Sequence, residues 1–106
     1  MDINSKLYVS ESLKPKTKQI INKIKKNKKM ISLYCITNAV NDENLLEIHY
    51  YNEFFQNVYR KYYHFTLYGI AKTKQEAYEL VEKMVKDCME ENGDCDLKRF
   101  LNKSSK

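Results

Sequence analysis

The sequence predicts an α+β domain of two layers, in which helices pack on one face of a three-stranded, mainly antiparallel sheet. Two segments, residues 13–28 and 73–92, repeat apolar residues every three or four positions, as amphipathic helices do. Three short segments between them are rich in β-branched and aromatic residues, as strands are. Because each helix has only one apolar stripe, we expect both to cover the same face, in the order helix, strand, strand, short helix, strand, helix, helix.

The composition is that of one folded domain. A chain of 106 residues rarely divides into two cores, and its two glycines and one proline argue against long disordered linkers. We therefore assign residues 13–102 to a single domain. Residues 1–12 are expected to form a polar lead-in, with Leu7–Val9 as a candidate short edge strand, and residues 103–106 to form a disordered tail.

The first predicted helix begins near Ser12 and ends by about Lys28. Ser12 is a good N-cap residue, and Pro15 lies close to the first turn, where its missing N–H leaves no hydrogen bond unmade. A narrow apolar stripe runs from Leu13 to Ile24 at helical spacing. The rest of the helix surface carries lysines, namely Lys14, Lys16, Lys18, Lys23, Lys25 and Lys26.

Three strands are expected between the helices. Residues 31–37 form the first, and a turn at residues 41–44 leads to the second at residues 45–51, so a hairpin is predicted. The second segment alternates apolar and polar residues, which is typical of a half-buried strand. Residues 52–60 fit either a short helix or a frayed strand, and we favour the helix. Residues 62–71 form the third predicted strand.

The second long helix has the clearest boundaries in the chain. Thr73 followed by Glu76 is a capping box, and Gly93 is a typical left-handed helix stop. A last short helix at residues 96–102 is expected to return to the core. The apolar stripe of the long helix consists of Ala77, Leu80, Val81, Met84, Val85, Cys88 and Met89.

Tyrosine is the most unusual feature of the composition, with nine in the chain and seven of them between Tyr34 and Tyr68. If both helices cover one face, alternation along the strands sends many of these rings to the other face, where a partner is needed to keep them from water. We therefore predict a non-enzymatic protein-interaction or self-association module, most simply a homodimer. Alternatively, the last helix folds over this face and the rings are ordinary core. The residues of the predicted binding face are Tyr34, His49, Tyr51, Tyr62, His64 and Tyr68.

Positive charge is concentrated near the start of the chain. The net charge is +5, while residues 1–29 hold nine lysines against Asp2 and Glu11, which makes +7. Such a segment makes RNA or DNA an alternative partner, and a solvated helix face explains the same charge. The lysines predicted to contact phosphate in this alternative are Lys18, Lys23, Lys25, Lys26 and Lys74.

No enzyme chemistry is predicted. The odd number of cysteines, three, does not fit a disulfide framework and indicates a reducing compartment. His49 and His64 could share a metal ion if they lie opposite each other, but they lack ligand spacing. No nucleophile, base and orienting group can be named together, so we expect no catalytic residue, no metal and no cofactor. Without a long apolar stretch or an apolar leader, a cytoplasmic chain with no membrane contact is expected.

Two resemblances add to this prediction. The segment Gly69–Ala77 resembles the strand-to-helix junction of double-stranded RNA-binding domains, with a hydroxyl cap at Thr73 and a lysine at Lys74. This resemblance implies RNA binding, although those domains have a lysine pair and a glycine-proline-histidine loop that this chain lacks. Over its whole length the chain is similar to a group of short bacterial proteins without assigned activity, through its lysine-rich first helix and its acidic helix followed by Gly93 and Asp94. That similarity implies a bacterial cytoplasmic domain and no site residues.

Overall fold

The computed structural model describes residues 2–38, 46–55, 65–94 and 96–102. These residues form an α+β fold around a four-stranded mixed sheet, with helices on both of its faces. The α+β class predicted from the sequence is confirmed. The three-stranded sheet with helices on one face is wrong, and the reasons lie in the first strand and in the distribution of apolar residues.

The four strands are β1 (Asp2–Val9), β2 (Tyr34–Asn38), β3 (Leu46–Tyr50) and β4 (Thr66–Ala71). Their order across the sheet is β1-β4-β2-β3. β1 runs parallel to β4, whereas β2 is antiparallel to both β4 and β3. The predicted hairpin is confirmed as β2 and β3. The segment expected as a polar lead-in contains the whole of β1, so the candidate edge strand at Leu7–Val9 begins earlier, at Asp2.

Helical segments in the described part of the chain are η1 (Glu11–Lys16), α1 (Thr17–Lys25), η2 (Tyr51–Phe55), α3 (Lys74–Asn92) and α4 (Leu97–Asn102). The first predicted helix is therefore split into a 3₁₀ helix, η1, and the α-helix α1 that follows it. η2 confirms the short helix predicted after the second strand, while residues 56–60 and the tail at 103–106 lie outside the described residues. No helix among the residues described is long and apolar enough to cross a membrane.

The ends of α3 are set by the signals that the sequence contains. The Thr73 side-chain oxygen accepts a hydrogen bond from the backbone N–H of Glu76 at 3.1 Å. Gly93 has a φ of 74°, a left-handed conformation that a residue without a Cβ adopts freely. The predicted boundaries of this helix are confirmed.

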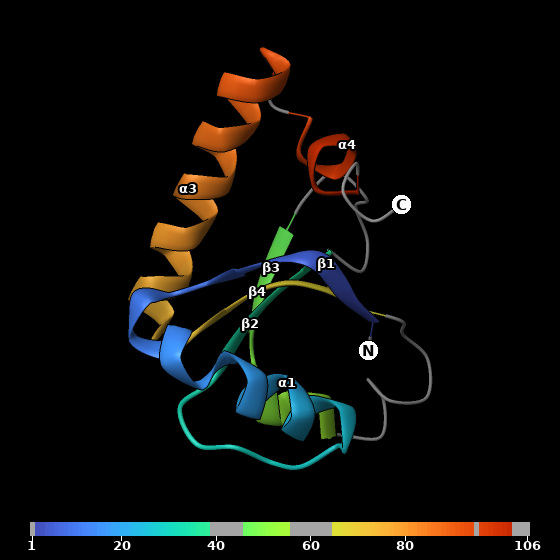
Figure 1. Ribbon diagram of the computed structural model, residues 1–106, viewed down its shortest axis with the longest axis vertical. Helices are drawn as coiled ribbons and strands as arrows, with labels where there is room; N and C mark the ends of the chain where they lie inside the picture. Colours follow the sequence, from blue (N-terminus) through green and yellow to red (C-terminus); the bar gives the residue numbers. More distant parts are fainter. Residues whose placement is uncertain (1, 39–45, 56–64, 95, 103–106) are drawn as a thin grey trace.

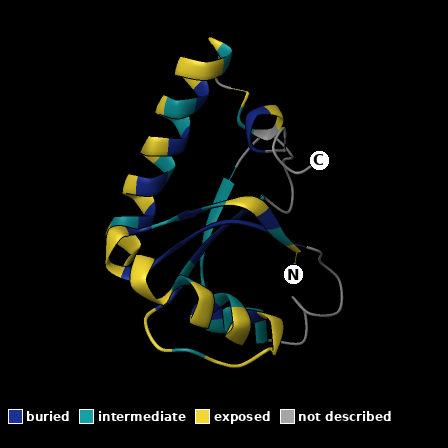
Figure 2. Cartoon of the chain, viewed as in Figure 1, coloured by how far each residue is buried: buried dark blue, intermediate teal, exposed yellow. Residues whose placement is uncertain are grey.

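Helices cover both faces of the sheet. α3 and α4 pack on one face through a cluster that includes Ile36, Met84 and Leu101. η1, α1 and η2 pack on the other through a cluster that includes Ile20 and Leu67. Figure 1 shows α1 and α3 well apart, with the strands between them, and Figure 2 shows the centre of the sheet in the buried colour. A strand covered on both faces is apolar along its length rather than alternating, and β4 is buried from its second residue to its last.

A bulge in β4 changes which residues share a face. Ile36 of β2 pairs with Gly69 and the next residue, Thr37, pairs with Leu67, so the register shifts by one at Tyr68. Tyr68 consequently packs with the α3 cluster, whereas Ile70 packs with the α1 cluster. Counting by twos along the strand places these two residues together, and that prediction is wrong.

Polar side chains tie β1 to the helices above it. Asn4 is buried, and its amide donates a hydrogen bond to the backbone carbonyl of Leu101 in α4 at 3.1 Å. The Tyr8 hydroxyl donates to the carboxylate of Asp87 in α3 at 2.7 Å. Buried polar groups are tolerated when such bonds are made, and this explains how a strand with a polar sequence reaches the interior.

Candidate functional site

The predicted aromatic binding face is not one surface. Tyr51 is 3% exposed and packs on the α1 side, whereas Tyr68 is 5% exposed and packs on the α3 side. Tyr34 is half-buried, also on the α3 side. Tyr62 and His64 lie outside the described residues. Because helices cover both faces of the sheet, Tyr51 and Tyr68 belong to the core on opposite faces, and the prediction that these two rings share one open face is wrong.

Tyr51 has a structural role on the α1 side. Its hydroxyl donates a hydrogen bond to the backbone carbonyl of Lys28 at 2.8 Å, and its backbone N–H donates to the carbonyl of Leu33 at 2.9 Å. Burial raises the pKa of the Tyr51 hydroxyl to about 12, with a smaller contribution from Cys35. Tyr51 thus anchors the loop that follows α1.

His49 lies between two carboxylates. Its Nε2 is 3.0 Å from Glu47 Oε1, and its Nδ1 is 3.6 Å from Glu53 Oε2. The His49 ring also packs against Phe54 and Phe65, with ring centres 5.3 and 5.6 Å apart, while His64 lies outside the described residues. The ranges described contain no group of three residues that could hold a metal ion.

The described cysteines are packed inside the protein. Cys35 and Cys88 are both fully buried. Burial raises the pKa of the Cys35 thiol, and the Cys88 thiol donates a hydrogen bond to the carbonyl of Asp94 at 3.1 Å. Cys95 lies outside the described residues. Neither described thiol is placed to act as a nucleophile, because a reactive cysteine needs access and a lowered pKa.

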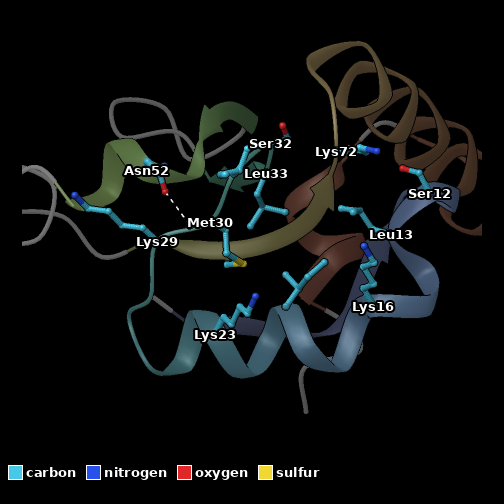
Figure 3. Close-up of a pocket in the computed structure, with 12 residues that line it drawn as sticks. Ser12, Leu13, Lys16, Lys23, Lys29, Met30, Ser32, Leu33, Asn52 and Lys72 are labelled. Carbon is cyan, nitrogen blue, oxygen red and sulfur yellow. Dashed lines mark hydrogen bonds between the residues drawn. The ribbon is translucent and has the colours of Figure 1, made fainter.

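A groove opens on the α1 side of the molecule, between the first helical segment, the loop after α1 and the start of η2 (Figure 3). Its volume is about 520 Å³. Leu13, Ile20 and Leu33 are buried apolar residues in its wall, and Figure 3 shows Leu13 and Met30 pointing into the space above the helix. The groove therefore has an apolar floor.

Lysines surround this floor. The twelve residues that line the groove include four lysines and no aspartate or glutamate. We call these four the groove lysines: Lys16, Lys23, Lys29 and Lys72. All four are exposed; Figure 3 shows Lys16 and Lys23 directed toward the groove and Lys29 pointing away from it, and Lys72 lies near the Glu76 carboxylate.

The fold brings the groove lysines together from three parts of the chain. Lys16 and Lys23 are seven residues apart and rise from the same side of the first helical segment in Figure 3. Lys72 directly follows β4. Lys29 belongs to the loop after α1, where its ammonium nitrogen lies 5.7 Å from the centre of the Phe55 ring in η2.

The loop after α1 is held in a defined shape. Asn27 and Ser32 each have a φ of 56°, a left-handed conformation that is uncommon for residues other than glycine and more so for serine than for asparagine. Besides the bond from Tyr51, the N–H of Met30 donates to the side chain of Asn52 at 3.2 Å. Between these fixed points Ile31 is 90% exposed, and Figure 2 shows the loop in the exposed colour. Backbone strain of this kind is often found at binding sites.

The sequence identified only part of this groove. Of the lysines predicted to contact phosphate, Lys23 lines it, whereas Lys18, Lys25, Lys26 and Lys74 are exposed elsewhere. Sequence reasoning missed three of the four groove lysines. Lys16 could have been found from its spacing of seven residues from Lys23, since both flank the apolar stripe. Lys29 and Lys72 line the groove only because the chain folds these segments next to α1, and no local sequence pattern predicts that position.

Comparison with known proteins finds no matching family model, no matching curated protein and no matching solved structure.

Proposed function

We propose that this protein is a non-enzymatic nucleic-acid-binding module, and that the groove lysines contact phosphates. The observation that carries this proposal is the lining of the groove, which combines four lysines with no carboxylate. A polyanion is the natural ligand for such a site, because each phosphate contact releases condensed counterions.

Positive charge predominates around the groove, although the Glu76 carboxylate, hydrogen-bonded to Ser12, lies near Lys72. Residues 11–29 contain eight lysines and one carboxylate, that of Glu11, which pairs with Lys14 at 2.7 Å. Mixed surface charges usually neutralise one another, so a one-sided cluster supports binding to an anionic partner. The buried thiols and the carboxylate-bound histidine supply no group that would favour catalysis over binding.

Binding of a fluorescently labelled oligonucleotide, followed by anisotropy at several salt concentrations, tests this proposal. We expect affinity to fall steeply with salt, and we expect the double variant Lys16→Glu/Lys23→Glu to lose at least about 10-fold in affinity. The matched control is Lys83→Glu/Lys86→Glu on α3, which makes the same change in net charge on the other side of the sheet and should leave most of the binding intact. Equal losses in both variants, or no binding at low salt, would contradict the proposal.

Self-association along the β3 edge is a second candidate function. β3 pairs with β2 on one side, and no described residue pairs with its other side. An unpaired strand edge can accept a strand from a second copy, and the half-buried rings of Tyr34 and Tyr50, 5.4 Å apart, lie on β2 and β3 at this end of the sheet. Sedimentation equilibrium at increasing concentration tests this candidate, and a strict monomer at the highest concentration contradicts it.

A further inference from the structure

We infer that the groove binds single-stranded nucleic acid in preference to duplex, with an unpaired base on the apolar floor, phosphates at the groove lysines and Ile31 in contact with a neighbouring base. This inference rests on the proposed function and specifies the form of nucleic acid that the site takes.

The chemistry of the groove matches a nucleotide in two parts. The floor is apolar, with half-buried Met30 beside the buried residues Leu13, Ile20 and Leu33, and an apolar floor suits the flat face of a base. The groove lysines stand around this surface and suit the charged backbone. The volume of about 520 Å³ falls within the range of small-molecule sites, so a base and its sugar are of suitable size.

A duplex matches only one of these parts. Its phosphates could contact the lysines, but its bases are stacked and paired inside the helix and cannot reach the apolar floor. A single strand can turn its bases outward, and proteins that bind single strands combine a positively charged groove with apolar or aromatic contacts to the bases. The apolar floor therefore favours the single strand.

The position of Ile31 supports the same conclusion. Ile31 lines the groove and is 90% exposed, while the loop around it is pinned to η2 through Lys28 and Met30. An isoleucine side chain cannot bind a phosphate, because it has no charge and no hydrogen-bond donor. At the mouth of a cationic groove it can instead contact a base. Apolar side chains that contact or separate bases are a known device of nucleic-acid-binding proteins.

The test compares a labelled single strand of about 12 nucleotides with the duplex of the same sequence, by anisotropy at low salt. We expect the single strand to bind at least about 10-fold more tightly. A duplex that binds equally well or better overturns this inference and leaves the proposed function standing. Absence of binding to either form overturns both. Polyglutamate should compete poorly, because it lacks a base, and competition equal to that of unlabelled single strand also overturns the inference.

Two matched pairs of variants separate contact with the base from contact with the phosphate. Ile31→Ser should weaken single-strand binding about 10-fold and leave its salt dependence unchanged, because no charge is removed. Its control is Tyr78→Ser, which removes another exposed hydrophobic side chain, on α3, and should change affinity less than about 2-fold. A change in Ile31→Ser no larger than in this control overturns the base contact.

Lys16→Gln/Lys23→Gln should lower the affinity and also reduce the slope of log affinity against log salt by about 1.4, since each phosphate contact on a single strand contributes about 0.7. The control, Lys18→Gln/Lys25→Gln, removes the same charge at the same spacing of seven residues, but from positions outside the groove. We expect a clearly smaller change in slope. Equal changes would mean a diffuse electrostatic surface and would overturn the role of the groove. Far-ultraviolet circular dichroism checks that every variant is folded.

Discussion

The two sides of the sheet differ in how completely a helix covers them and in the charge that they present. On one side α3 is 19 residues long, and its residues Ala77, Met84 and Cys88 have no exposed surface. On the other side α1 has 9 residues and its buried residues are Ile20 and Ile24. Beside this short helix lies the groove, whose floor is formed by the buried residues Leu13, Ile20 and Leu33 and the half-buried Met30.

Charge follows the same division. α3 carries six carboxylates and three lysines, whereas residues 11–29 carry eight lysines and one carboxylate. The comparison suggests a separation of tasks, in which the α3 side supplies most of the stability and the α1 side supplies the binding surface. Substitutions on the two sides should therefore affect different measurements.

The largest effect on stability is expected from Met84→Ala. Met84 is fully buried between α3 and the sheet, and removal of a buried side chain of this size lowers the free energy of unfolding by about 2–5 kcal/mol. Urea denaturation measures the change, and oligonucleotide affinity should stay the same under conditions where the variant is folded. Ile20→Ala, at the groove wall, should cost about 2 kcal/mol, the low end of the same range, because its side chain borders the groove. A larger loss of stability in Ile20→Ala than in Met84→Ala would contradict the claim that the α3 side supplies most of the stability.

Gly69→Val should also destabilise the α3 side. A Cβ atom at Gly69 would lie 3.0 Å from Ile36 Cδ1 and 3.0 Å from Met84 Cε, closer than ordinary contact. Overpacking of this kind lowers the free energy of unfolding by about 1–3 kcal/mol. Thermal denaturation should show a lower midpoint. A variant as stable as the parent would mean that the core beside β4 has more room than the structure indicates.

Tyr51→Phe tests whether the buried Tyr51 hydroxyl makes the stability of the α1 side depend on pH. Burial raises the pKa of Tyr51 from 10.0 to about 12. The resulting stabilisation is fully present below pH 10, where both folded and unfolded forms keep the proton, and it is lost as pH rises through 12 because the unfolded form ionises first. Urea denaturation on either side of pH 10 should show a shallower decline for Tyr51→Phe than for the parent. An identical decline would show that this hydroxyl does not keep its proton in the folded state.

The smallest effect is expected from Ser12→Ala, at the junction of the two sides. The Ser12 hydroxyl donates a hydrogen bond to Glu76 at 2.7 Å, and this bond, followed by one from Ser10, lowers the pKa of the Glu76 carboxyl below 4.5. A lowered pKa stabilises the fold above the unfolded value, and this contribution is lost as pH falls through the folded value. A carboxyl titration followed by nuclear magnetic resonance should show the Glu76 pKa rising toward 4.5 in the variant. No rise would mean that Ser12 does not contact Glu76 in solution.

The fold was predictable where local signals act alone. The cap at Thr73 and the stop at Gly93 fix α3, and alternation identifies β3. The sequence predicted β1 too short. Its polar residue Asn4 is buried and donates a hydrogen bond to Leu101, 97 positions away, and no local pattern reveals such a contact. The sequence predicted the wrong face of the sheet for Tyr68, because a bulge in β4 shifts the register. The side chains around the bulge do not indicate it.

The candidate site was predictable only as a lysine-rich helix. The sequence places Lys23 beside an apolar stripe, but it does not show that the loop after α1 and the end of β4 meet that helix. The number of tyrosines suggested an aromatic surface instead, but Tyr51 and Tyr68 are core residues because both faces of the sheet are covered. Long-range assembly, rather than composition, decides which surface remains open.

The most direct test of the central claim is a nuclear magnetic resonance titration of the isotope-labelled protein with an unlabelled single-stranded oligonucleotide. A chain of 12.7 kDa gives resolved backbone amide spectra. We predict that the amides which shift lie in residues 16–33 and next to Lys72, with the largest change in the loop that carries Ile31. Shifts concentrated along α3 instead, with residues 16–33 unaffected, would contradict the account.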